Sequence, residues 1–139
     1  MKIKRIKKKL FIICIILFVV IQYHYKSFRT VLGTNEYNIT KVGMQNGNSG
    51  GYVSTTDKEK IKELFNLVNK RYYGKSIIQL HMTTGYSYYF DFYVGDKVAL
   101  RMLGSGNLIE LNNKYYIVTK SVDNDSLTSW FNSLPVSYY

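Results

Sequence analysis

The chain has 139 residues, a formal net charge of +10 at pH 7, one cysteine and 14 tyrosines. Six of its 19 basic residues lie in the first nine positions, MKIKRIKKK, where no acidic residue occurs, and the rest is nearly balanced in charge. A nucleic-acid-binding domain spreads its positive charge over the fold, so this distribution argues against a nucleic-acid partner. With one cysteine the chain forms no internal disulfide, and its stability must come from packing.

The basic segment 1–9 leads directly into an apolar run, LFIICIILFVVI, at residues 10–21. A basic segment followed by a short apolar stretch is typical of a secretory signal. Because no small residues follow the run, we expect an uncleaved signal anchor over residues 10–25; cleavage near Val31–Gly33 remains the alternative. Twelve apolar residues rise only about 18 Å, so a single-pass span needs flanking lysines that snorkel and interfacial tyrosines.

The charge asymmetry around this run predicts the orientation of the chain. Six cations precede the run and two, Lys26 and Arg29, follow it closely. By the positive-inside rule the N-terminus is cytoplasmic, and the C-terminal domain lies outside the cell membrane. Cys14 lies within the apolar run and not after a lipobox, which predicts a buried apolar residue of the membrane segment.

Residues 26–36 are polar and weakly patterned, and we expect a juxtamembrane spacer there, followed by one domain over 37–139. Residues 37–44 and 52–55 form a hairpin around the turn-rich stretch QNGNSGG. A helix follows, with Thr56 as N-cap and Glu59 completing a capping box. Its apolar residues recur at helical spacing from Ile61 to Tyr72, and Gly74 is its expected stop.

Alternating apolar residues then predict strands at 76–82, 86–94, 97–103, 108–111 and 114–119. Matching their core faces requires three-residue loops at 83–85 and 95–97, the second of which pairs Val94 with Val98. A four-residue loop next sets Met102 opposite Ile109. A last helix spans about 124–134, with Asp123 or Ser121 as its cap. The fold class is α+β, two-layered, with an antiparallel meander sheet and two helices packed on one face.

Three groups of residues invite a catalytic interpretation, and none supports it. Ser49 lies in a Gly-x-Ser-Gly-Gly stretch, but too little chain precedes it for the rest of a serine-protease triad. His81 has no second histidine or cysteine with which to hold zinc. The predicted register lines up Asp91, Arg101 and Glu110, where the arginine favours ionised carboxylates and opposes a general acid. We therefore expect no enzyme activity, no metal and no cofactor.

The tyrosines point instead to a binding surface. The register places Tyr89, Tyr93 and Tyr115 on the outer face of the sheet beside Arg101, and these four are the predicted partner-binding residues. Tyrosine supplies contact area at low entropic cost and is enriched in interfaces. The alternative is that a loop or the C-terminal helix covers this face.

Four segments carry a resemblance over residues 39–131. They are a strand at Asn38–Val42, a helix start at Thr55–Leu64 (TTDKEKIKEL), and strands at Tyr88–Tyr93 and Asn113–Ile117. Their order resembles a family of small uncharacterised domains exported by Gram-positive, Bacillus- and Clostridium-type bacteria behind a signal peptide, lipobox or anchor. The resemblance implies an α+β fold outside the cytoplasm, and it supplies no catalytic residue.

These features together predict a membrane-anchored, extracytoplasmic binding module that contacts a protein or a cell-envelope component. The alternative is an immunity or inhibitor protein against a toxin, bacteriocin or cell-wall hydrolase. Small size, an anchor and the lack of catalytic groups suit both interpretations.

Overall fold

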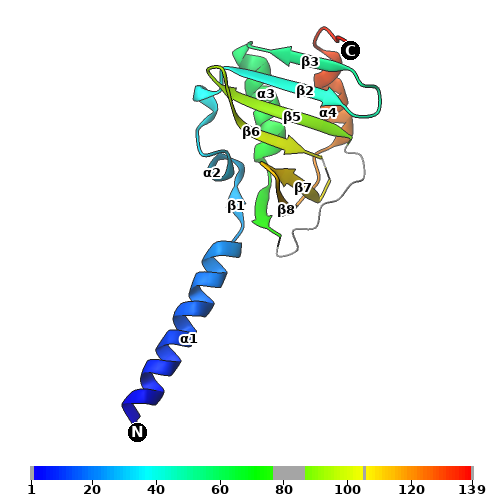
Figure 1. The fold of residues 1–139 in the computed structure, drawn as a ribbon. Coiled ribbons are helices and arrows are strands. Elements are labelled where there is room, and N and C mark those ends of the chain that lie inside the picture. The colour runs from blue at the N-terminus through cyan, green and yellow to red at the C-terminus, as the bar shows by residue number, and fades with distance from the viewer. Residues whose placement is uncertain (1, 77–86, 105, 139) are drawn as a thin grey trace.

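The computed structural model describes residues 2–76, 87–104 and 106–138 and has an α+β fold built on one antiparallel sheet (Figure 1). The sheet has eight strands in the order β1-β4-β8-β7-β6-β5-β2-β3. The elements are α1 (Lys2–Tyr23), β1 (Lys26–Ser27), α2 (Phe28–Leu32), the 3-10 helix η1 (Glu36–Asn38), β2 (Lys41–Asn46), β3 (Tyr52–Thr55), α3 (Lys58–Asn69), β4 (Tyr72–Lys75), β5 (Tyr88–Val94), β6 (Lys97–Leu103), β7 (Leu108–Leu111), β8 (Lys114–Val118) and α4 (Asn124–Asn132).

The core lies between the sheet and the helices α3 and α4, which Figure 1 shows behind it. We call the sheet face toward these helices the inner face and the opposite one the outer face. The inner-face strand residues alternate along each strand, as a half-buried sheet requires. The two helices contribute the apolar residues Ile61, Leu64, Phe65, Val68, Leu127, Trp130 and Phe131. Trp130 also donates a hydrogen bond from Nε1 to the carbonyl of Lys60 at 2.9 Å, which joins α4 to α3.

Both helices begin at an aspartate. Asp57 caps α3, and its carboxylate accepts the backbone N–H of Glu59 at 2.8 Å and that of Lys60 at 3.4 Å. The predicted capping box at Thr56 is therefore wrong by one residue, since Asp57 offers a carboxylate directly to the first turn. Asp123 caps α4 as predicted, and hydrogen bonds from Ser126 lower the pKa of its carboxyl.

The end of α3 also differs from the prediction. The helix stops at Asn69, and the residues after it form β4 instead of a further helical turn. Tyr72, predicted on the apolar helix face, is 58% exposed in this strand. Gly74 is not a helix stop: its Cα lies against the ring of Tyr25, where a side chain would collide. Pairing with β1 and β8 outweighs the helical spacing of the apolar residues, because the strand gains ladder hydrogen bonds and buries Tyr73 and Gly74.

The expected spacer is part of the domain. Ser27 caps the short helix α2, and Phe28 within it is fully buried. The ring of Phe28 contacts those of Phe65 and Phe92 at centroid distances of 5.3 Å. The domain therefore begins at about residue 26 and not at 37, because two apolar residues in a polar stretch, Phe28 and Leu32, reach the core.

The strand register agrees with the prediction in part. Asp91 lies opposite Arg101 as expected, and the β2–β3 hairpin forms. The β5–β6 turn has two residues, Gly95 and Asp96, not three. A bulge between Phe92 and Tyr93 takes up the extra residue and sets Val98 opposite Tyr93 on the outer face, while Val94 is 38% exposed at the end of its strand.

The β6–β7 pairing is shifted by two residues from the predicted one. Met102 lies opposite Leu111, and Leu103 opposite Glu110. Side chains keep their faces because the pleat repeats every two residues, but Glu110 is not opposite Arg101. The strand predicted at 76–82, including His81, lies outside the described residues from position 77 onward.

Helix α1 extends away from the rest of the chain (Figure 1). Residues 6–21 are exposed along its whole described surface, including the apolar run 10–21. Within the part of the chain that the structure describes, no helix reaches the length and apolarity that a membrane crossing requires.

Candidate functional site

The outer face of the sheet carries a hollow of about 340 Å³ near the end formed by β2, β3, β5 and β6. We call this feature the outer-face hollow. It is lined by Gly43, Gln45, Tyr52, Tyr89, Asp91, Arg101 and Leu103. Two of the four predicted partner-binding residues, Tyr89 and Arg101, thus line one cavity.

Glycine at position 43 makes room for the hollow. Gly43 lies between Ser54 of β3 and Asp91 of β5, on the strand next to the β3 edge of the sheet. The ring of Tyr52 crosses over it: a Cβ at position 43 would lie 3.1 Å from Cζ and 3.2 Å from Cε2 of that ring and would collide with the hydroxyl. The ring of Tyr52 therefore lies over Gly43 with its hydroxyl end nearest, and it forms a wall of the hollow.

Arg101 is held in place by a two-pronged ion pair. Its Nε donates to Oδ1 of Asp91 at 2.7 Å, and one Nη donates to Oδ2 at 2.9 Å. The hydrogen bond and the negative charge of Asp91 raise the pKa of Arg101, so the guanidinium is always charged. The guanidinium of Arg101 has five N–H donors, and two of them bond to Asp91. The arginine side chain is 57% exposed. The pair therefore presents a fixed, exposed guanidinium to the hollow.

Tyr93 lies on the same outer face but outside the hollow. It lies opposite Lys41, whose Nζ is 5.2 Å from the centroid of the tyrosine ring. That distance is within the range of a cation–π contact. Burial, followed by the charge of Asp91, raises the pKa of Tyr93, so the phenol stays protonated and can donate a hydrogen bond.

Tyr115 does not belong to the site. It lies on the outer face opposite Glu110, as the alternation predicted, but only 4% of it is exposed. The sequence had placed its strand at the end of the meander. In the structure β8 is an interior strand between β7 and β4. The prediction of Tyr115 as a contact residue is therefore wrong.

The sequence reasoning missed Gly43, Gln45 and Tyr52. They come from the hairpin that precedes α3, and no local pattern indicates that β2 pairs with β5. The predicted neighbour of β5 was the segment 76–82. A possible signal was Gly43 itself, because a glycine inside a strand often marks a close approach of another group.

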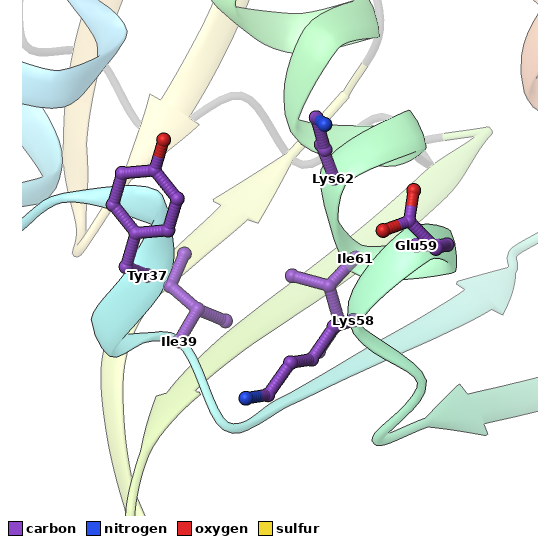
Figure 2. A pocket seen from close by; sticks show the side chains of 6 residues that line it. All are labelled: Tyr37, Ile39, Lys58, Glu59, Ile61 and Lys62. Carbon is purple, nitrogen blue, oxygen red and sulfur yellow. The ribbon is translucent and has the colours of Figure 1, made fainter.

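A second, smaller hollow of about 230 Å³ lies beside the first turns of α3, where Figure 2 shows Tyr37 and Ile39 facing residues of that helix. We call it the α3 groove. Its floor is formed by Ile39 and Ile61, which are buried, and its rim by Lys58 and Lys62 with Tyr37, which is 83% exposed. No ion pair fixes these lysines within the described residues, so the groove lacks the positioned polar group that Arg101 provides in the outer-face hollow.

The structure gives Ser49 a role in a turn. The side chain of Asn46 accepts the N–H groups of Asn48 and Ser49, and Oγ of Ser49 accepts the N–H of Gly51 at 3.2 Å. Gly50 has a positive φ of 73°, which favours glycine. Among the described residues no group of three or more histidine, cysteine, aspartate or glutamate side chains could hold a metal ion.

Comparisons with protein-family models, with curated proteins and with solved structures gave no match. The chemistry of the site is therefore argued from its residues alone. A fixed guanidinium next to half-buried aromatic rings can hydrogen-bond an acceptor while the rings contact a flat or apolar group.

Proposed function

We propose that the chain is a membrane-attached, extracytoplasmic binding module without enzyme activity. Its outer-face hollow contacts a protein or a component of the cell envelope. The observation that carries the proposal is the pairing of Arg101 with Asp91 inside a cavity walled by tyrosines.

The composition of the outer-face hollow favours recognition over catalysis. Tyrosine and arginine are enriched in the contact residues that dominate binding energy. Arg101 is positioned before any ligand arrives, which lowers the entropic cost of binding. Acceptors of suitable geometry include carboxylates, phosphates and the carbonyl or hydroxyl oxygens of peptides and glycans.

Helix α1 supports the attachment to a membrane. Its run 10–21 is apolar on every side and exposed, and such a surface is unfavourable in water. The run alone is too short to cross a membrane, so Lys8 and Lys9 before it and Tyr23 after it would complete the span at the two interfaces, where long cations snorkel and aromatic rings are favoured. The orientation follows from the cations that precede the run: N-terminus in the cytoplasm, domain outside.

A capture experiment tests the recognition proposal. The full chain in detergent is immobilised and exposed to an envelope extract from a Gram-positive bacterium, beside a variant carrying Tyr89→Ser and Arg101→Gln. The control variant carries Leu108→Ser and Ile117→Ser, exposed residues of the same face outside the hollow.

We expect a component that the wild-type chain and the control retain and that the hollow variant loses. Equal capture by all three chains would refute a binding role for the outer-face hollow. If the retained component is a toxin or a wall hydrolase, the role is that of an inhibitor or immunity protein.

The attachment has a separate test. Intact mass measured on chain extracted from membranes should equal that of the full 139-residue sequence, apart from processing of the initiator methionine. A mature chain that starts near residue 34 would show that the apolar run is removed and would refute the anchor.

A further inference from the structure

A cluster of basic side chains lies at the foot of the domain, where α1 meets the sheet. It surrounds a hollow of about 140 Å³ lined by His24, Lys26, Tyr73, Lys75, Lys114 and Tyr116. The three lysines come from three adjacent strands, β1, β4 and β8. We call His24, Lys26, Lys75 and Lys114 the basic foot.

The basic foot has no compensating charge in the described structure. No aspartate or glutamate lines its hollow, and no ion pair involves its lysines among the residues that the structure describes. Elsewhere on the domain basic residues do have acidic partners, as in Lys60–Glu63 and Arg101–Asp91. Three amines around one cavity repel each other unless an anion lies between them.

The two tyrosines complete an anion-binding arrangement. The ring of Tyr73 forms the floor, because this residue is fully buried and its hydroxyl donates to the carbonyl of Val68 at 2.7 Å. Burial raises the pKa of Tyr116, so its hydroxyl keeps its proton and can donate a hydrogen bond. Lysine ammonium groups and a phenol are suitable donors for phosphate oxygens.

The position of the basic foot indicates which phosphate-bearing molecules it can reach. Lys26 follows the end of α1 at Tyr23 by three residues, and Figure 1 shows β1 directly above that helix. The ring of Tyr25 packs against the backbone of Gly74 in β4, which fixes the junction. The end of the exposed apolar helix and the three lysines therefore face the same region.

We propose that the basic foot binds the phosphate groups of anionic phospholipids in the leaflet next to the domain. The inference rests on the proposed membrane attachment through α1 and adds a second contact with the same membrane. Each lysine near an anionic surface strengthens attachment about five-fold. The two contacts together fix how the domain stands on the membrane.

This docking has a consequence for the outer-face hollow. The basic foot lies on strands at one end of the sheet order, and the hollow lies at the other end. Five strand spacings separate β4 from β2, which corresponds to about 24 Å at ~4.8 Å per strand. The docked domain thus presents the hollow away from the lipid surface, toward soluble or wall-bound ligands.

Lysine footprinting on the full chain tests the proposal. The chain is incorporated into nanodiscs of phosphatidylcholine alone or of phosphatidylcholine with phosphatidylglycerol, and the rate of amine acetylation is measured for each lysine by mass spectrometry. We expect Lys26, Lys75 and Lys114 to react about five-fold more slowly in the phosphatidylglycerol discs. Lys58, Lys62 and Lys97 serve as controls and should react equally in both, and high salt should abolish the difference.

Three other outcomes would overturn the docking, the attachment or the lipid source. Equal rates for the basic foot in both discs would overturn the docking while leaving the attachment through α1 intact. Failure of the chain to enter either disc would overturn the attachment and the docking together. Equal protection by inorganic phosphate in phosphatidylcholine discs would assign the hollow to free anions and overturn a lipid source.

A matched pair of variants adds a readout of orientation. One variant changes Lys26, Lys75 and Lys114 to glutamine, and the other changes Lys58, Lys62 and Lys97 to glutamine, which removes the same charge. The single tryptophan, Trp130, serves as energy donor to dansyl-labelled headgroups. We expect the first variant alone to change the transfer efficiency in phosphatidylglycerol discs; identical transfer by wild type and both variants would contradict the docking.

Discussion

Replacing Phe28 with alanine tests whether the segment before the predicted domain is part of its core. The side chain is fully buried in contact with Phe65, Phe92 and Tyr73, at centroid distances of 5.3, 5.3 and 5.5 Å. Burial of the ring contributes about 2–3 kcal/mol, and each aromatic contact about 0.5–1.5 kcal/mol. Together with the cavity left behind, we expect Phe28→Ala to lower the free energy of unfolding by about 3–5 kcal/mol.

Urea unfolding of the full chain in detergent, followed by tryptophan fluorescence, measures this loss. Trp130 is 1% exposed and hydrogen-bonded to Lys60, so its emission reports on the packed core. Tyr37→Ala is the control, because that ring is 83% exposed and its removal should change the free energy by less than about 0.5 kcal/mol. A loss below about 1 kcal/mol for Phe28→Ala would show that α2 is not an essential part of the core.

Three further predictions concern a helix cap, a buried charge and the shape of the site. Asp57→Ala should lower the free energy of unfolding by about 1 kcal/mol and Thr56→Ala by less than about 0.5 kcal/mol; the reverse order in urea unfolding would restore Thr56 as the cap. Arg71 is 2% exposed, and burial lowers its pKa; its Nε and one Nη have no hydrogen-bond partner among the residues that the structure describes. Arg71→Met should therefore leave the urea midpoint unchanged or raise it, because the buried charge is lost, and a clear drop would contradict this. Gly43→Ala should displace the ring of Tyr52 and weaken capture by the outer-face hollow, with a stability loss below about 1 kcal/mol; unchanged capture would exclude Tyr52 from the site.

The elements with strong local signals were predictable from the sequence. Asp123 before a run of helically spaced apolar residues marked α4, and the glycine- and asparagine-rich stretch marked the β2–β3 turn. The Asp91–Arg101 pair was predicted correctly from alternation although the loop was not, because the bulge between Phe92 and Tyr93 restores the predicted register. In each case the residues that determine the feature are close in sequence.

The errors concern features that depend on distant partners. Phe28 stands in a polar stretch, and only the rings of Phe65 and Phe92 show why it is buried. Tyr115 lies on the outer face as predicted, yet it is 4% exposed, and alternation along β8 alone does not show this burial. Alternation gives the face of a side chain but not which strands flank it.

The outer-face hollow shows the same limit. Tyr89 and Arg101 were predicted because both lie on the β5–β6 hairpin, where pairing is local. Gly43 and Tyr52 were missed because their hairpin joins β5 through a pairing across more than forty residues of chain. The part of the site on the β5–β6 hairpin could be predicted, whereas the part on the β2–β3 hairpin and the concave shape could not.

The structure also shows which fragment suits a soluble binding assay. A fragment that begins at residue 30 lacks Phe28 and the β1 strand, so it loses part of the core. A fragment from residue 24 keeps both, together with the packing of Tyr25 on Gly74.

The capture comparison on envelope extract is the direct test of whether the outer-face hollow binds a partner. We expect a component that binds the wild-type chain and the Leu108→Ser, Ile117→Ser control. The variant with Tyr89→Ser and Arg101→Gln should lose it. Equal retention by the hollow variant, with its urea midpoint unchanged, would contradict the assignment of the outer-face hollow as the binding site.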